Sequence, residues 1–127
     1  LDKLWGAAVR ANSGRLCAYC KKNEGTAAHH IFSRRHKSTR WDPDNGVLLC
    51  FYCHIRIAHE DPEIFRDFLV RTLGAEKLER LKNRAMSPAG KIDFDLWELT
   101  LKRFVEEVRR GSLDGPRRGF GATLRGA

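Results

Sequence analysis

The chain has 127 residues, 42% hydrophobic and 31% charged, and its 24 lysines and arginines against 16 acidic residues give a formal net charge of +8 at pH 7. This length supports one core of ordinary size, which excludes a multidomain enzyme, a collagen-like repeat and a largely disordered polymer. The longest apolar run, residues 47–53, is too short to span a bilayer, and the first residues lack the apolar core of a signal peptide. We therefore expect an intracellular protein without membrane contact, and the basic charge favours a polyanionic partner.

The first half of the chain is expected to contain one helix and two strands. Apolar residues recur at helical spacing in residues 1–12, up to an Asn-Ser-Gly break, which predicts an N-terminal helix. Residues 27–32 are typical of a strand, and residues 47–49 of a second one. Between the strands lie a basic loop, residues 33–40, and the turn-forming residues 42–46.

Helices are predicted for the segments that follow the second strand. The first begins at about residues 50–53 and continues to residue 59, because isoleucine and alanine fill it and nothing breaks it before Pro62. Asp61 is an N-cap candidate for the next helix, with proline at the first helical position and an acidic residue in the first turn. The apolar face of that helix consists of Ile64, Phe65, Phe68 and Leu69.

Two more helices and a tail complete the prediction. One helix follows Gly74 and ends at residues 87–90, where serine and proline stand. The last begins at about Asp93, and its apolar stripe comprises Leu96, Trp97, Leu101, Phe104, Val105 and Val108. Residues 111–127 are rich in glycine and arginine, so we expect a flexible basic tail.

The four cysteines form two Cys-x2-Cys pairs, and all five histidines lie between the first pair and just beyond the second. Each pair presents two sulfurs at a spacing that suits a tetrahedral ion, so four thiolates complete the shell of a structural zinc. Disulfides or a redox pair are the alternative, but no export signal or thioredoxin-like unit accompanies them. We therefore predict a structural Zn²⁺ held by Cys17, Cys20, Cys50 and Cys53.

Several aromatic residues are assigned to packing. Those expected in the core are Trp5, Phe65, Phe68, Trp97 and Phe104. Tyr19 and Tyr52 stand inside the two Cys-x2-Cys turns, and we expect both to pack around the zinc.

The histidines beside these pairs suggest a second metal. His54 follows Cys53 directly, and neighbours on a helix differ by about 100°, so a His54 beside a zinc-facing cysteine points elsewhere and can bind another ion. His29 and His30 are adjacent on a strand and point in divergent directions, so one can bind a cation while the other accepts a proton from water. The short segment that contains the cysteines and histidines cannot bury enough apolar area to hold such a site, so zinc would supply the missing stability.

The series of Cys-x2-Cys, His29-His30, Asn45, and a second Cys-x2-Cys with His54 resembles the HNH endonucleases. It is most similar to phage-type members whose ββα-metal site is built on a treble-clef zinc fold, over roughly residues 15–70. The resemblance implies an α+β fold: a small zinc-stapled ββα-metal core with an N-terminal helix and additional C-terminal helices. We predict one HNH domain at residues 1–110, with the core at about 15–60 and a helical extension at 61–110.

The resemblance also implies an activity: metal-dependent hydrolysis of DNA phosphodiester bonds, giving 5′-phosphate and 3′-hydroxyl ends. In this family pattern His29 and His54 bind the catalytic cation, Mg²⁺ or Mn²⁺ with Ni²⁺ or Zn²⁺ as alternatives. His30 is the general base that activates water, and Asn45, the second catalytic residue of the pattern, holds the loop between the strands.

Four cations in the basic loop are suited to phosphate contacts: Arg34, Arg35, Lys37 and Arg40. Either Arg34 or Arg35 is expected to touch the scissile phosphate. A solvated loop is the plainer interpretation of this cluster. The partner implied by the resemblance is double-stranded DNA, in a phage-encoded or bacterial cytoplasmic protein, and a second copy of the chain or a phage-encoded partner protein stays open.

Two further alternatives stay open. Members of the family often place another metal ligand one helical turn after the first helix histidine, where this chain has Ala58, so His59 or a water takes that place and His59 is left unassigned, as is His36. The rival function is a non-catalytic, zinc-containing nucleic-acid-binding module, in which the histidines are structural and the basic loop binds. A nuclease acting on RNA or a branched junction is a third interpretation.

Overall fold

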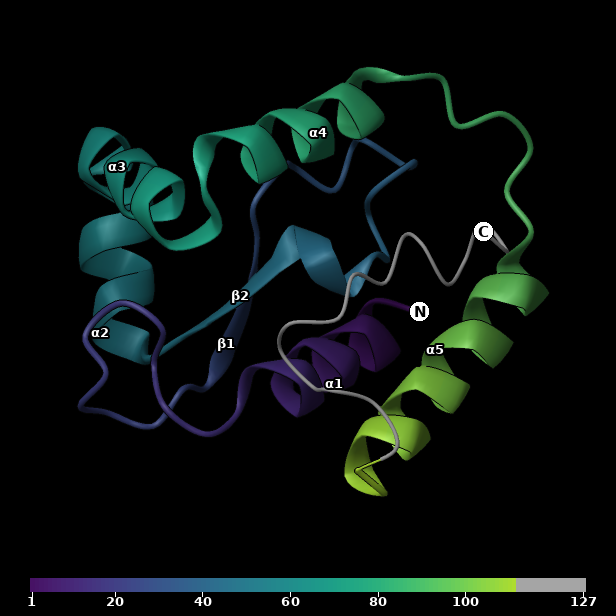
Figure 1. Cartoon of the computed structure of the whole chain (residues 1–127), viewed down its shortest axis with the longest axis horizontal. Helices are drawn as coiled ribbons and strands as arrows, with labels where there is room; N and C mark the ends of the chain where they lie inside the picture. The colour runs from purple at the N-terminus through teal and green to yellow at the C-terminus, as the bar shows by residue number, and fades with distance from the viewer. Residues whose placement is uncertain (112–127) are drawn as a thin grey trace.

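The computed structural model describes residues 1–111, so the predicted tail lies, from residue 112 onward, outside the described part of the chain. The elements are, in order, α1 (Asp2–Ser13), β1 (Ala27–His30), the 3-10 turn η1 (Pro43–Asn45), β2 (Gly46–Leu49), α2 (Phe51–Cys53), the π-helix η2 (His54–His59), α3 (Pro62–Leu73), α4 (Ala75–Met86) and α5 (Phe94–Arg109). The predicted α+β class is confirmed: a two-stranded sheet lies amid the helices (Figure 1).

The strands β1 and β2 are antiparallel, with Ala27 paired to Leu49 at one end and His30 to Gly46 at the other. The first strand is two residues shorter than predicted. Its ladder ends because the next two backbone N–H groups, of Ile31 and Phe32, donate to the backbone and side-chain oxygens of Asn45 instead of to β2.

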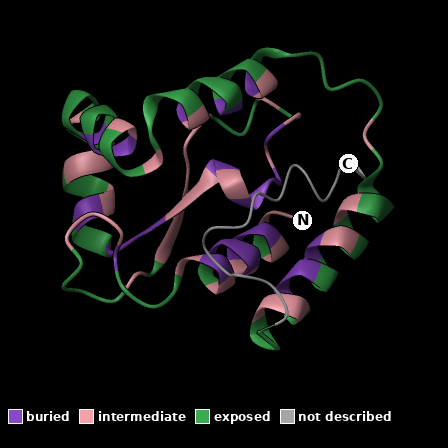
Figure 2. Ribbon diagram, in the orientation of Figure 1, coloured by how far each residue is buried: buried purple, intermediate pink, exposed green. Residues whose placement is uncertain are grey.

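One hydrophobic core joins α1 to α5 and to the loop before β2. Its buried residues are Trp5, Ala8, Val9, Trp41, Leu101, Phe104 and Val105. Figure 2 shows buried residues along α1 and along the side of α5 that faces it. Helix α1 also packs on the sheet, where the first residue of β2, Gly46, has no side chain to hold it away. The N-terminal helix is therefore part of the framework around the strands.

A second core surrounds the cysteines and extends to α3 and α4. Its buried residues are Cys17, Leu49, Cys50, Cys53, Phe65, Phe68, Leu69 and Leu78. Tyr19 packs edge-on against Phe68, as expected of a residue near the zinc ligands. The expectation for Tyr52 is wrong, because its side chain is 61% exposed on the outer side of α2.

Two details of the predicted helices differ in the structure. Asp61 precedes α3 as predicted, yet it makes no capping hydrogen bond, since its backbone (φ −135°, ψ 66°) lies outside the conformation from which an N-cap side chain reaches back. Asp93 does cap α5, accepting from the Leu96 N–H at 2.9 Å. The apolar stripe of α5 is also narrower than predicted, because Leu96 is exposed. None of the described helices combines the length and apolarity that crossing a membrane requires.

Candidate active site

The four predicted zinc ligands converge on one point. Their Sγ atoms all lie within 4.8 Å of one another, and those of Cys20 and Cys50 are 4.0 Å apart. None of the four is in a disulfide. A tetrahedral zinc with bonds of about 2.3 Å needs sulfurs about 3.8 Å apart, so this donor set fits the ion.

Hydrogen bonds to sulfur prepare the cysteines for a metal. The backbone N–H groups of Asn23 and Lys22 lower the pKa of Cys20 to about 6, because they stabilise the thiolate. The Asn23 side-chain amide also donates to Cys50 Sγ at 3.7 Å, and the Cys53 N–H donates to the same sulfur at 3.4 Å. The turns therefore favour the thiolate, the form that binds zinc, at Cys20 and Cys50, whereas burial raises the pKa of Cys53.

Three histidines form a second cluster. His29 comes from β1, and His54 and His59 from η2, and one ring nitrogen of each lies within 4.8 Å of the others. The Nε2 atoms of His54 and His59 are 3.1 Å apart. Neighbouring ligands at right angles on one ion, with bonds of about 2.1 Å, are about 3 Å apart, so the imidazoles fit a divalent cation.

The helix carrying His54 and His59 is a π-helix, where the sequence predicted an α-helix. Its carbonyls bond five residues ahead, as the Glu60 N–H does to Ile55 O at 3.2 Å. In an α-helix Ala58 would lie one turn after His54, whereas the wider turn brings His59 there. The structure thus adds to the cluster a histidine that sequence reasoning had left unassigned.

Burial favours the neutral form of two of these imidazoles, His29 and His54. It lowers the pKa of His29 to about 4, and repulsion from His54 and His59 adds to the effect. The pKa of His54 is lowered for the same reasons, burial first and then the charge of His59. Neutral imidazole is the form that binds metal, so burial prepares His29 and His54 for a cation.

His30 lies beside the cluster but faces another way. Its ring stacks on Trp5, with centroids 3.7 Å apart and planes 7° from parallel. Its Nε2 is 2.9 Å from the carbonyl oxygen of Arg40. A carbonyl only accepts, so Nε2 carries the proton and Nδ1 keeps a lone pair. Burial lowers the pKa of His30 despite that hydrogen bond, so the ring is a base at neutral pH.

Helix α1 holds His30 through two contacts that the sequence did not reveal. Trp5 was assigned only to the core, but it forms the flat surface under the His30 ring and donates its indole N–H to Asp42 O at 2.8 Å. Asp2 accepts two hydrogen bonds from Arg40, at 3.1 and 2.7 Å. The Arg40 carbonyl accepts the hydrogen bond of His30. Asp2 therefore fixes the His30 imidazole indirectly, because it holds Arg40 in place.

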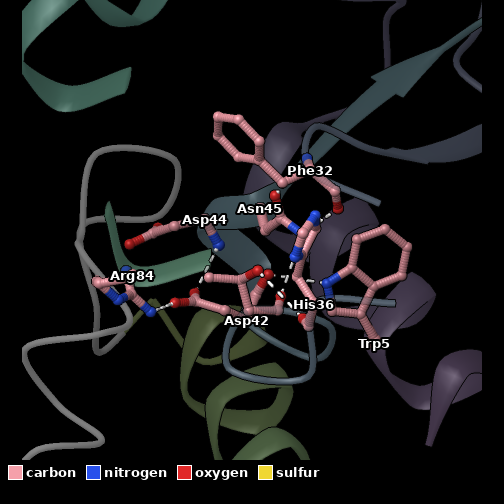
Figure 3. A network of polar contacts seen from close by, with 8 residues as sticks. Trp5, Phe32, His36, Asp42, Asp44, Asn45 and Arg84 are labelled. Atoms are coloured by element: carbon pink, nitrogen blue, oxygen red, sulfur yellow. Dashed lines mark hydrogen bonds and ion pairs between the residues drawn. The ribbon is translucent and has the colours of Figure 1, made fainter. Parts of the chain in front are cut away.

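Asn45 closes the loop between the strands (Figure 3). Its side chain is fully buried, accepts from Phe32 N at 2.8 Å, and donates to Phe32 O at 2.9 Å and to Thr39 O at 3.1 Å. All three partners are backbone groups of the loop. Asn45 can therefore fix the position of the loop, but it is too deeply buried to touch a substrate.

A buried carboxylate ties the same loop to α4. Asp42 is fully buried, accepts from the Asp44 N–H at 2.9 Å, and forms an ion pair with Arg84 of α4, which Figure 3 shows. Its carbonyl receives the Trp5 indole. Asp42 thus links the loop before β2 to two helices.

The four predicted phosphate contacts lie in different places. Arg34 and Arg35 line a cavity of about 910 Å³ together with His30 and all three clustered histidines. Lys37 instead lines a cavity beside α4 and α5, and Arg40 is turned to Asp2. His36 belongs to neither of the metal-type clusters found in the described residues. The cavity therefore unites the histidines with two of the four predicted cations.

Comparison with known proteins identifies the central segment. Residues 17–60 match the family model described as HNH endonuclease, which is the family that the sequence resembles. The segment contains both clusters, His30 and Asn45, and the match indicates a function related to nucleases or nucleic acids for this part of the chain. No curated protein and no solved structure matches the chain.

Proposed function

We propose that this chain, whose residues 17–60 match the HNH endonuclease family model, is a metal-dependent enzyme that hydrolyses double-stranded DNA to 5′-phosphate and 3′-hydroxyl ends. One observation carries the proposal: a single cavity is lined by three histidines grouped as metal ligands and by a fourth with a free ring nitrogen. A zinc-binding module that only bound nucleic acid would need neither feature.

The residues that would hold the catalytic cation are His29, His54 and His59. Their rings would supply three nitrogen ligands and leave other positions open for substrate. When bound there, Mg²⁺ or Mn²⁺ supplies positive charge that stabilises the scissile phosphate and the leaving oxygen. The cysteine cluster fits a structural Zn²⁺, whose four thiolate ligands leave no open position.

His30 takes the proton from the attacking water at Nδ1. As the ring becomes cationic, its Nε2–H keeps the hydrogen bond to Arg40 O, and the Trp5 ring lies parallel against it. These contacts prevent the imidazole from rotating away from the water. General-base catalysis of this kind contributes about 10²- to 10⁴-fold to the rate.

Arg34 and Arg35 supply positive charge to the substrate phosphates. Both are exposed and line the cavity of the histidines. Arg34 lies 3.7 Å from the Asp2 carboxylate, whereas Arg35 has no ion pair within residues 1–111. Arg35 is therefore the freer of the two to contact the scissile phosphate.

Cleavage of supercoiled plasmid in Mg²⁺ or Mn²⁺ tests the proposal. We expect nicked or linear product that EDTA abolishes and that falls at least about 100-fold in His30→Ala. The matched control is His36→Ala, which removes a histidine of the neighbouring loop outside both clusters and should cleave normally. Zinc content and thermal unfolding verify that each variant is folded.

Two results would contradict the proposal. Equal cleavage by His30→Ala and the unmodified chain would exclude His30 as the base. If no metal supports cleavage while the folded protein still binds DNA, the chain is a binding module and its histidines serve another purpose.

A further inference from the structure

We propose that α1, which lies outside the HNH segment, forms a DNA-binding wall of the active-site cavity, where Lys3 and Arg10 bind backbone phosphates that flank the scissile one. The inference rests on the proposed function and adds to it a second set of substrate contacts. Neither residue belongs to the basic loop or to the matched segment.

The geometry begins with the face of α1. Lys3, Gly6 and Arg10 are spaced i, i+3 and i+7, so they lie along one side of the helix, and all three line the cavity of the histidines. The side chains of Lys3 and Arg10 are exposed. The substrate-facing side of α1 therefore carries one cation near each end.

Gly6 makes room for one of these cations. Glycine in the interior of a helix costs about 0.5–1 kcal/mol relative to alanine, so its place here needs a reason. A Cβ at Gly6 would lie 3.3 Å from Arg10 Nη1 and 4.0 Å from Ala28 Cβ, so the guanidinium occupies space that a side chain would fill. Arg10 Nη2 also donates to Thr26 O at 3.3 Å, just before β1. The guanidinium has five N–H donors, so others remain for a phosphate.

The charge of the cavity favours a polyanion. Its positively charged lining residues, apart from the histidines, are Lys3, Arg10, Arg34 and Arg35, and its one acidic residue, Asp2, is already paired with arginine. Lys3 has no ion pair within the described chain. DNA fits this distribution, because its backbone carries one negative charge at every phosphate along the strand.

The spacing on α1 also matches a DNA strand. Seven residues of α-helix rise about 10 Å. Phosphates of one strand advance about 3.4 Å per base pair, so this rise corresponds to about three steps. Lys3 and Arg10 can thus contact two phosphates of the same strand, in a manner independent of base sequence.

The test is the salt dependence of DNA binding, measured with full-length protein in a His30→Ala background so that the DNA stays intact. Each phosphate contact adds about 0.9 to the slope of log K against log salt. The double variant Lys3→Gln/Arg10→Gln should therefore lower the slope by about 1.8. The matched control is Lys82→Gln/Arg103→Gln, which removes one exposed lysine and one exposed arginine outside the cavity and should leave the slope unchanged.

A variant that keeps both positive charges provides a second part of the test. The swap Lys3→Arg/Arg10→Lys keeps both cations and should recover the slope, whereas a folding defect would not be rescued. Equal losses in the cavity pair and the control pair, or no loss in either, overturn the inference. If the unmodified chain cleaves DNA while the cavity pair changes nothing, only α1 is excluded. If it neither binds nor cleaves DNA, the proposed function fails as well.

Discussion

The cysteine cluster and the histidine cluster lie next to each other in the chain but differ in how deeply their residues are buried. Three of the four cysteines are buried, and the Cys50 sulfur receives hydrogen bonds from the Asn23 side-chain amide and the Cys53 N–H. Of the three histidines none is fully buried, His59 is exposed, and the cluster lines a cavity. A closed set of four thiolates suits a structural ion, and an open set of imidazoles suits one that meets substrate.

The two clusters meet in the sequence at the peptide bond between Cys53 and His54. Helix α2 ends at Cys53 and the π-helix begins at His54, so two consecutive residues contribute a cysteine to one cluster and a histidine to the other. In the proposed function, consecutive residues of one small segment thus serve stability and catalysis separately. The following substitutions act on one side of this division at a time.

Cys53→Ser should have the largest effect. It removes a buried thiolate ligand, and structural zinc contributes on the order of 10 kcal/mol to folding in small domains, comparable to the whole stability of many of them. We expect loss of bound zinc and of cooperative thermal unfolding, measured by metal analysis and circular dichroism. If the variant binds no zinc and still unfolds at the same temperature as the unmodified chain, the cysteines do not stabilise the fold through a metal.

Asn45→Ala should destabilise the chain by at least about 3 kcal/mol, because it leaves two carbonyls and one N–H of the loop without partners. Urea unfolding in the presence of zinc measures this loss. Zinc content should stay normal, since the loop is separate from the cysteines. A loss below about 1 kcal/mol would contradict the role of Asn45 in holding the loop.

Trp5→Leu should lower kcat about 10- to 100-fold with little change in KM, because His30 loses the flat surface that orients its ring. The matched control is Val9→Ala, which weakens the same core by about 2 kcal/mol without touching His30. Steady-state cleavage of a short duplex separates the two constants. An equal fall of kcat in the control would mean that Trp5 acts only through stability.

His59→Ala should have the smallest effect on the fold, since the residue is exposed. We expect Mn²⁺ affinity to fall at least about 10-fold, with zinc content and unfolding temperature unchanged. Calorimetric titration with Mn²⁺ measures the affinity. The double variant Ala58→His/His59→Ala should not restore it in a π-helix, so restoration would show that an α-helix carries the ligands.

The sequence predicted most of what local patterns determine. The paired cysteines, the position of both strands and the beginnings of α3, α4 and α5 agree with the structure to within two residues. Spacing and turn residues suffice for these features, because the residues concerned are close in the chain or belong to a recognisable series.

Long-range contacts account for what the sequence did not predict. Trp5 stacks on His30 from 25 residues away, and Arg40 pairs with Asp2 instead of lining the histidine cavity. Neither contact has a local signal in the sequence. The π-helix was missed because isoleucine, alanine and histidine are equally compatible with an α-helix. The histidine that follows Ala58 was the one available sign of the wider turn.

Gly46 stands opposite His30 in the sheet, and a Cβ there would lie 2.4 Å from Val9 Cγ2 and 2.8 Å from Trp5 Cζ2. One methyl group would therefore push α1 outward and separate the Trp5 indole from the His30 ring, without touching the cysteine cluster or the histidine cluster. Gly46→Ala is accordingly expected to give a chain that still binds zinc but lacks the proposed cleavage activity. Position 46 thus offers a way to test the proposed activity without altering any residue that lines the cavity.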